Sequence, residues 1–226
     1  LTPSDYGVTS MIITVSSFMM PLITLRVEDA IVRRYYDKGK INIYIGNCII
    51  IVATMTLLMS FAMFLTSHLL SQATQIPYFV YFFIPLYCFL SFIKTIFLYY
   101  LQVQQKATFY GVFSIVSTML EFSLAIFFVV VLHMTWEGQA LAMIIAVLFS
   151  AGFAYIALNK WDLICYQRDK ESASHALHYG LWLVPAGIGG TLMVMANRLF
   201  LTEMVSIDET GLYGVATSFA GLLAFV

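Results

Sequence analysis

Residues Ile41–Leu70 read INIYIGNCIIIVATMTLLMSFAMFLTSHLL, a run without a single Asp, Glu, Lys or Arg. A helix rises about 1.5 Å per residue, so roughly 20 apolar residues cross a bilayer core about 30 Å thick. This run exceeds that length and predicts a helix that spans a membrane.

Other apolar stretches of similar length follow along the chain. The composition agrees, because 61% of the residues are hydrophobic and 10% are charged, whereas soluble domains are about a quarter charged. These values exclude a soluble domain and predict an all-α, polytopic transmembrane helix bundle. Besides Ile41–Leu70, the expected spans are Gly7–Leu25, Tyr78–Leu101, Phe109–His133, Gly138–Leu158, Leu181–Leu201 and one that begins at Gly211.

The Lys and Arg residues predict the orientation of these spans. Alternate connecting segments are either basic or free of Lys and Arg, and basic loops face the cytosol. We therefore expect the basic connections on the cytosolic side. Outside the spans, the basic residues are Arg26, Arg33, Arg34, Lys38, Lys40, Lys106, Lys160, Arg168 and Lys170. Arg26–Arg33 is expected to continue the first helix into the interface, with Asp29 paired to Arg33 four residues later.

A short internal repeat predicts two halves. Asp5–Ser10 (DYGVTS) recurs with one insertion as Leu212–Ser218 (LYGVATS), at the start of a helix of the same orientation. An even helix offset predicts six-helix lobes related by an axis along the membrane normal. Residues 1–158 would be the first lobe without its first helix, residues 159–180 a cytosolic inter-lobe linker, and residues 181–226 the first two helices of the second lobe, the second one truncated. We therefore interpret the sequence as part of a longer protein.

Charged residues inside spans are the candidate functional groups, because each is costly in lipid unless it is paired or hydrated. Lys94 and Glu121 are expected at similar depth. They form either a buried ion pair that fixes packing, or a hydrated site in which Glu121 titrates or binds a cation. Arg198 either snorkels to the interface or binds an anion. Pro185–Gly190 is either a close helix contact or a hinge.

The sequence shows no catalytic constellation and no phosphate-binding loop. His175 and His178 lie three residues apart, but no further ligand stands at a suitable spacing, so we interpret them as solvated loop residues. We expect a protein that is not an enzyme and that uses no metal or other cofactor.

Several segments together resemble the bacterial polysaccharide and O-antigen repeat-unit flippases (Wzx-type) of the multidrug/oligosaccharidyl-lipid/polysaccharide exporter superfamily. The opening is similar to the loop after that family's first helix, and the later segments follow in the family's order. Asn197 stands where the family usually has Asp. The segments are Leu1–Gly7, Thr24–Arg33, Gln105–Ala107, Gly138–Ala140, Asn197–Arg198 and Gly211–Gly214.

The resemblance implies a two-lobe transporter of the bacterial inner membrane that opens alternately to each side. Its substrate would be an oligosaccharide on undecaprenyl pyrophosphate, as used in lipopolysaccharide and other cell-envelope glycans. Arg26, Lys94 and Arg198 would bind the anionic head group, and Glu121 is the candidate for ion coupling. Membrane lipids and other polysaccharide assembly proteins are the expected partners, and nucleic acid is not.

Three alternatives remain open at this point, and one of them is a purely structural membrane subunit, against which the buried charges and the six-helix repeat argue. A cation-coupled multidrug antiporter of the same fold would line its cavity with acidic rather than basic residues. A membrane-embedded enzyme of envelope assembly would require a large loop or a catalytic cluster at the membrane surface.

Overall fold

The computed structural model describes residues 2–36, 41–74 and 77–223, and over these ranges the chain is helical and contains no strand. Six of the helices are long and apolar enough to cross a membrane. The predicted all-α polytopic bundle is confirmed. The helices are α1 (Pro3–Thr24), α2 (Val27–Tyr36), α3 (Ile41–Thr74), α4 (Phe83–Val103), α5 (Ala107–Ile126), α6 (Trp136–Lys160), α7 (Lys170–Met204) and α8 (Ile207–Leu223). A 3₁₀ turn (Tyr78–Phe82) precedes α4, and a π-helical turn (Phe127–Val131) ends α5.

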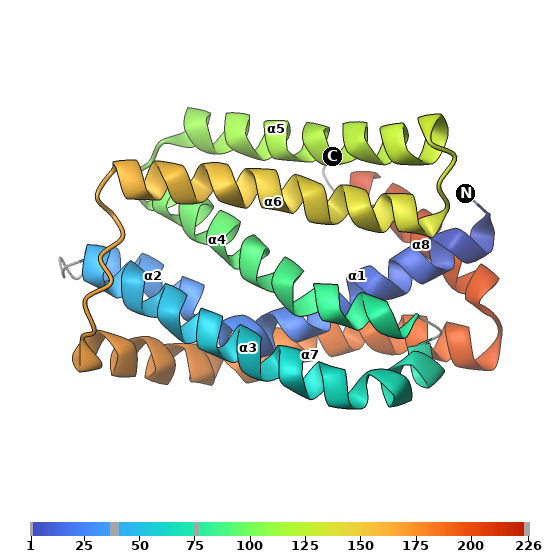
Figure 1. Cartoon of the computed structure of the whole chain (residues 1–226), viewed down its shortest axis with the longest axis horizontal. Helices are drawn as coiled ribbons and strands as arrows, with labels where there is room; N and C mark the ends of the chain where they lie inside the picture. The colour runs from blue at the N-terminus through green and yellow to red at the C-terminus, as the bar shows by residue number, and fades with distance from the viewer. Residues whose placement is uncertain (1, 37–40, 75–76, 224–226) are drawn as a thin grey trace.

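The long helices run along the longest axis of the molecule (Figure 1). Helix α2 and the α4–α5 and α6–α7 connections lie at one end, on the left of the view, and these are basic segments. The α5–α6 and α7–α8 connections, which carry no Lys or Arg, lie at the other end. The structure thus separates basic from non-basic connections, as the sequence pattern predicts.

The core forms where α1, α2, α3 and α6 pack around α4. Met11 of α1, Tyr44 of α3 and Phe92 of α4 are wholly buried. Helix α6 presents a buried stripe of small residues at every fourth position, which lets a neighbouring backbone approach closely. That stripe packs α6 against α4 and consists of Ala142, Ala146, Ser150 and Ala154.

Helix α1 ends in a sharp break instead of continuing into the interface. Leu25 and Arg26 both adopt left-handed backbone conformations, with φ of 49° and 53°. The Thr24 hydroxyl accepts a hydrogen bond from the Arg26 amide at 3.2 Å and donates one to Glu28 Oε1 at 3.1 Å. The expectation of one continuous helix is therefore wrong, because this local hydrogen bonding starts a separate helix, α2.

Helix α7 begins at Lys170, about three turns before the expected Leu181. Asp169 caps it by accepting hydrogen bonds from the amides of Glu171 and Ser172. The connection before it is held on α3, where Asn47 donates to Gln167 O at 2.9 Å and accepts from the Asp169 amide at 3.3 Å. More than half of the segment predicted as a linker, residues 159–180, is therefore helical.

Helix α7 stays helical through Pro185 and packs on α1. A Cβ atom on Gly187 would lie 3.3 Å from Pro21 Cβ, whereas one on Gly189 or Gly190 would meet nothing within 4 Å. Gly187 therefore serves a close helix contact, the first of the two interpretations of this segment.

The two copies of the internal repeat pack against each other. Gly214 of α8 lies against α1, where an added Cβ would be 3.0 Å from Ser10 Oγ and 3.6 Å from Tyr6 Cε1. Both copies stand at the non-basic end of the molecule (Figure 1).

Candidate functional site: a charged cavity among α4, α5 and α6

A cavity of about 180 Å³ lies among α4, α5 and α6, in the middle of their membrane-spanning segments. Its lining combines charged and hydroxyl-bearing side chains with apolar ones. Helix α4 contributes Tyr87, Ser91, Lys94, Thr95 and Leu98, helix α5 contributes Ser117 and Glu121, and helix α6 contributes Met143, Ala146 and Val147.

Lys94 and Glu121 face this same cavity without bonding to each other. Among the described residues, the only ion pair within 4.0 Å joins Arg26 to Asp29. Lys94 and Glu121 therefore do not form an ion pair with each other. Two opposite charges that share a cavity in lipid without contact leave room for water, an ion or a ligand group between them. The geometry thus favours the hydrated site over the packed ion pair.

Hydroxyl groups extend the polar lining beyond the two charges. Ser117 is 5% exposed, whereas the other residues of α5 are exposed or only partly buried. Thr95 also lines the cavity, and its hydroxyl donates a hydrogen bond to Ser91 O at 2.8 Å, which leaves the oxygen able to accept another. Ser117 was not predicted from the sequence, because serine is common in transmembrane helices and its burial depends on which face of α5 meets α6.

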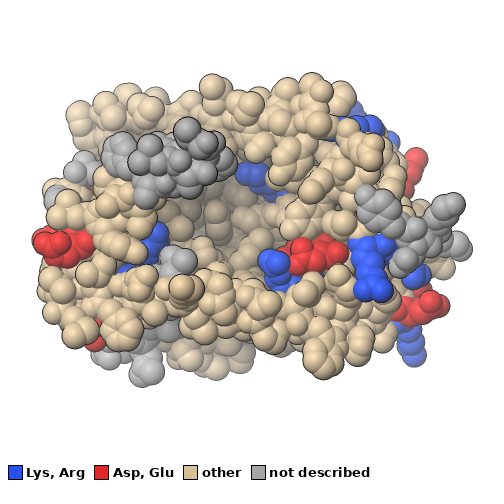
Figure 2. Space-filling view, turned by 180° about the vertical axis from the view of Figure 1, so that it is seen from behind, with Lys and Arg blue, Asp and Glu red and all other residues tan. Residues whose placement is uncertain are grey.

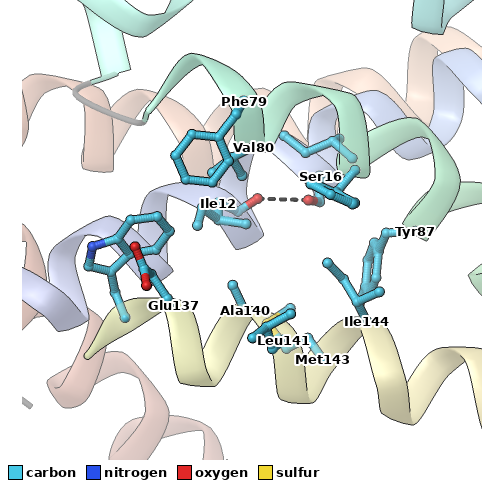
Figure 3. A pocket seen from close by; sticks show the side chains of 13 residues that line it. Ile12, Ser16, Phe79, Val80, Tyr87, Glu137, Ala140, Leu141, Met143 and Ile144 are labelled. Atoms are coloured by element: carbon cyan, nitrogen blue, oxygen red, sulfur yellow. Dashed lines mark hydrogen bonds between the residues drawn. The ribbon is translucent and has the colours of Figure 1, made fainter. Parts of the chain in front are cut away.

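A second cavity of about 300 Å³ adjoins the first toward the non-basic end (Figure 3). Tyr87 and Met143 line both cavities. The second cavity is mostly apolar, and Glu137 and Tyr87 lie at opposite ends of it in Figure 3. The two cavities together extend from the charged centre toward that end of the bundle.

Arg26 stands at the break between α1 and α2 and is engaged with Asp29. Its Nε lies 2.9 Å from Asp29 Oδ2, while the Tyr99 hydroxyl donates to Asp29 Oδ1 at 3.2 Å. The Arg26 side chain as a whole remains over a third exposed, although its Nε is buried. Asp29 therefore pairs with Arg26 and not with the predicted partner Arg33, because the break between α1 and α2 brings Arg26 close to it.

Arg198 ties α7 to α1. Its Nη1 donates hydrogen bonds to Ser10 O at 3.0 Å and to Thr14 Oγ1 at 2.6 Å. These contacts turn the guanidinium inward instead of letting it snorkel. Arg26 and Arg198 do not line the charged cavity, so the structure does not bring the three predicted head-group ligands together.

The surface hollow in Figure 2 has Lys and Arg side chains at several points around it. It lies on the face opposite to that seen in Figure 1. Asp or Glu side chains also lie to the right of the hollow in Figure 2, so its border carries both signs of charge.

Glu28 is a buried acid that the sequence did not predict as a candidate site residue. It is 3% exposed, and its Oε2 has no hydrogen-bond partner. Burial raises the pKa of its carboxyl group above the ordinary value, since loss of water disfavours the charged form. Its acidic and basic neighbours in sequence made it look like part of a solvated helix end.

The two histidines considered above have separate surroundings. His175 Nδ1 lies 3.0 Å from the Tyr44 hydroxyl, whereas His178 packs edge-on against Trp182. Within the described part of the chain, no group of three or more His, Cys, Asp or Glu residues is placed to hold a metal ion.

Comparison with known proteins gives one match. A family model described as polysaccharide biosynthesis protein matches residues 1–224, which is nearly the whole chain. No curated protein and no solved structure matches this chain significantly.

Proposed function

The chain belongs to the polysaccharide biosynthesis protein family, and we propose that it is part of a flippase for lipid-linked glycans. The protein would move undecaprenyl-pyrophosphate-linked oligosaccharides from the cytosolic to the outer leaflet of a bacterial inner membrane by alternating access. The observation that carries this proposal is the cavity in the middle of the spans where Lys94 faces Glu121 without an ion pair. A protein that only anchors enzymes to the membrane has no need of such a site.

The chemistry of the proposed substrate fits the available cation. A pyrophosphate that crosses the bilayer needs a positive partner at membrane depth, where water is scarce. The ammonium group of Lys94 supplies one on the cavity in the middle of the spans. Arg26 and Arg198 would join it only in a conformation that releases their present contacts with Asp29 and α1.

Glu121 is the proposed coupling residue. It shares the cavity with Lys94, so a proton or cation on Glu121 would change the net charge that an anionic substrate meets. We expect the transport rate of Glu121→Gln to lose its dependence on the ion gradient. A cation-coupled multidrug antiporter remains the second candidate, favoured by Glu137, which lines the adjoining apolar cavity.

The experiment uses the full parent protein in its own cells. We expect Lys94→Gln to lower the appearance of glycan on the outer face by about thirtyfold or more, the effect of removing one partner of a buried charge contact. Lipid-linked oligosaccharide should then accumulate on the cytosolic face. The matched control is Lys170→Gln, which removes an exposed lysine at the start of α7.

A double variant separates substrate contact from packing. Lys94→Gln leaves Glu121 without a counter-charge, so a purely structural role predicts that Lys94→Gln/Glu121→Gln restores transport. Continued loss in the double variant, with rescue by Lys94→Arg, supports contact with the substrate. Unchanged glycan lipids in depleted cells, together with new sensitivity to cationic drugs, would replace the flippase with the antiporter.

A further inference from the structure

A third cavity forms an apolar groove in the half of the bundle nearer the basic end. It has a volume of about 440 Å³ and lies among α4, α5 and α6. Several of the side chains that line it, such as Phe109, Val112 and Phe153, are exposed, so the groove is open to the surroundings. Ser117 lines both this groove and the charged cavity, so the groove ends near the middle of the spans.

The length of the groove corresponds to one leaflet. Along α5 it extends from Phe109 to Leu120, which is about 16 Å at the rise of an α-helix. This is roughly half the thickness of a bilayer core. A saturated or monounsaturated acyl chain in one leaflet covers that depth, whereas a polyprenyl chain is far longer than one leaflet.

Aromatic rings give the groove a firm wall. Phe97 and Phe113 meet edge to face with centroids 4.9 Å apart, and Phe113 stacks on Phe153 at 5.7 Å. Trp161 stacks on Phe97 at 5.8 Å and closes the basic end. Rings held by one another keep their positions, so the groove has a defined shape.

Positive charge stands at the mouth of the groove. Lys106 Nζ lies 5.1 Å from the centre of the Trp161 ring, in a cation–π contact that holds the ammonium group there. Lys160 is exposed and adjoins Trp161 in sequence. The first turn of α5, which starts after Lys106, has no side-chain cap and adds its partial positive charge.

We propose that this groove binds one acyl chain of an anionic phospholipid from the leaflet at the basic end, with the lipid phosphate beside Lys106. The charge complementarity at the mouth selects the anionic head group, and the leaflet-length apolar wall selects the chain. Little of the spanning part of α5 is buried, so a bound lipid would fill the space that α5 leaves against α4 and α6. This lipid site is distinct from the charged cavity at which the transported substrate is proposed to bind.

The test measures lipid binding to the purified full-length protein by native mass spectrometry, with phosphatidylglycerol and phosphatidylcholine of matched chains as the probes. We expect the wild type to bind phosphatidylglycerol more tightly. Lys106→Gln should weaken that binding about fivefold, the effect of one lysine near an anionic lipid surface, and should leave phosphatidylcholine unchanged. Val112→Trp should fill the groove and weaken both lipids.

Two controls match these variants. Lys170→Gln removes another exposed lysine at the basic end, and Ile115→Trp adds the same ring on an exposed face of α5 that does not line the groove. Neither should alter binding. Equal affinity of the wild type for the two lipids, or equal effects of Lys106→Gln and Lys170→Gln, would overturn the proposal. So would unchanged binding in Val112→Trp. The readout does not involve transport and therefore holds whatever substrate is carried.

Discussion

Glu28 shows how one buried carboxyl group makes stability depend on pH. The pKa of Glu28 is raised in the folded protein because burial removes water from the carboxylate. Its Oε1 accepts a hydrogen bond from the Thr24 hydroxyl. The folded state thus holds this proton to higher pH than the unfolded state does. By linkage, ionisation of Glu28 lowers the free energy of unfolding as pH rises from the unfolded pKa through the folded one.

We therefore expect Glu28→Gln to raise the melting temperature near neutral pH and to leave it unchanged well below the ordinary value of 4.5. Gln keeps the acceptor for Thr24 but cannot ionise. The measurement is the melting temperature of wild type and variant in detergent across this range. Exposed Glu171 is the control, and Glu171→Gln should show no such pH-dependent gain. A lower melting temperature for Glu28→Gln at pH 7 would show that the carboxylate is stabilising.

At the scale of single residues, the sequence predicted Lys94 and Glu121 at similar depth in the membrane, and the structure places both on one cavity. Charged residues in an apolar run are a strong signal because lipid penalises them. The partners of Arg26 and Arg198 were not predictable. Arg26 turns to Asp29 because of a backbone break, and Arg198 reaches an α1 carbonyl 188 positions earlier in the chain.

At the scale of elements, the approach of α7 to the α1–α2 break depends on Gly180. A Cβ atom there would lie 2.2 Å from Leu25 O and 3.2 Å from the Val27 amide nitrogen. The backbone of the break cannot yield easily, because Leu25 and Arg26 already occupy left-handed conformations. Gly180→Ala must therefore push α7 outward.

We expect Gly180→Ala to destabilise the protein by about 1–3 kcal/mol, the usual cost of overpacking, with a lower melting temperature. Gly189→Ala is the matched control on the same helix, since a Cβ there meets nothing within 4 Å. Alanine favours helix over glycine, so that variant should be neutral or slightly stabilising. Equal losses of stability in both variants would mean that glycine is required at position 180 for helix flexibility and not for the close contact with Leu25.

Hydrophobic runs located the spanning elements well, because lipid demands length and apolarity and both can be read from sequence. The expected span Ile41–Leu70 lies within α3, and Gly138–Leu158 lies within α6. Polar helix ends were less predictable. Helix α7 extends back to Lys170 because Asp169 caps it and Asn47 holds the preceding connection, and those contacts arise only once α3 and α7 are side by side.

At the scale of the whole molecule, the separation of charge gives the bundle two unlike ends. Basic segments gather at one end and the two copies of the repeat meet at the other (Figure 1). Six-helix periodicity predicted that the copies share an orientation, and their direct packing through Gly214 is a tertiary contact that periodicity alone does not provide. The same asymmetry predicts how the protein sits in the membrane.

Single-cysteine labelling in cells tests that orientation. With Cys48, Cys88 and Cys165 replaced, Thr135→Cys places a thiol in the α5–α6 connection and Gln167→Cys places one in the α6–α7 connection, both at exposed positions. Only α6 separates the two sites along the chain. Because basic loops stay in the cytosol, a membrane-impermeant maleimide should label Thr135→Cys in intact cells and Gln167→Cys only after permeabilisation. The reverse pattern would invert the orientation and with it the proposed direction of transport, whereas labelling of both from outside would show that α6 does not cross the membrane.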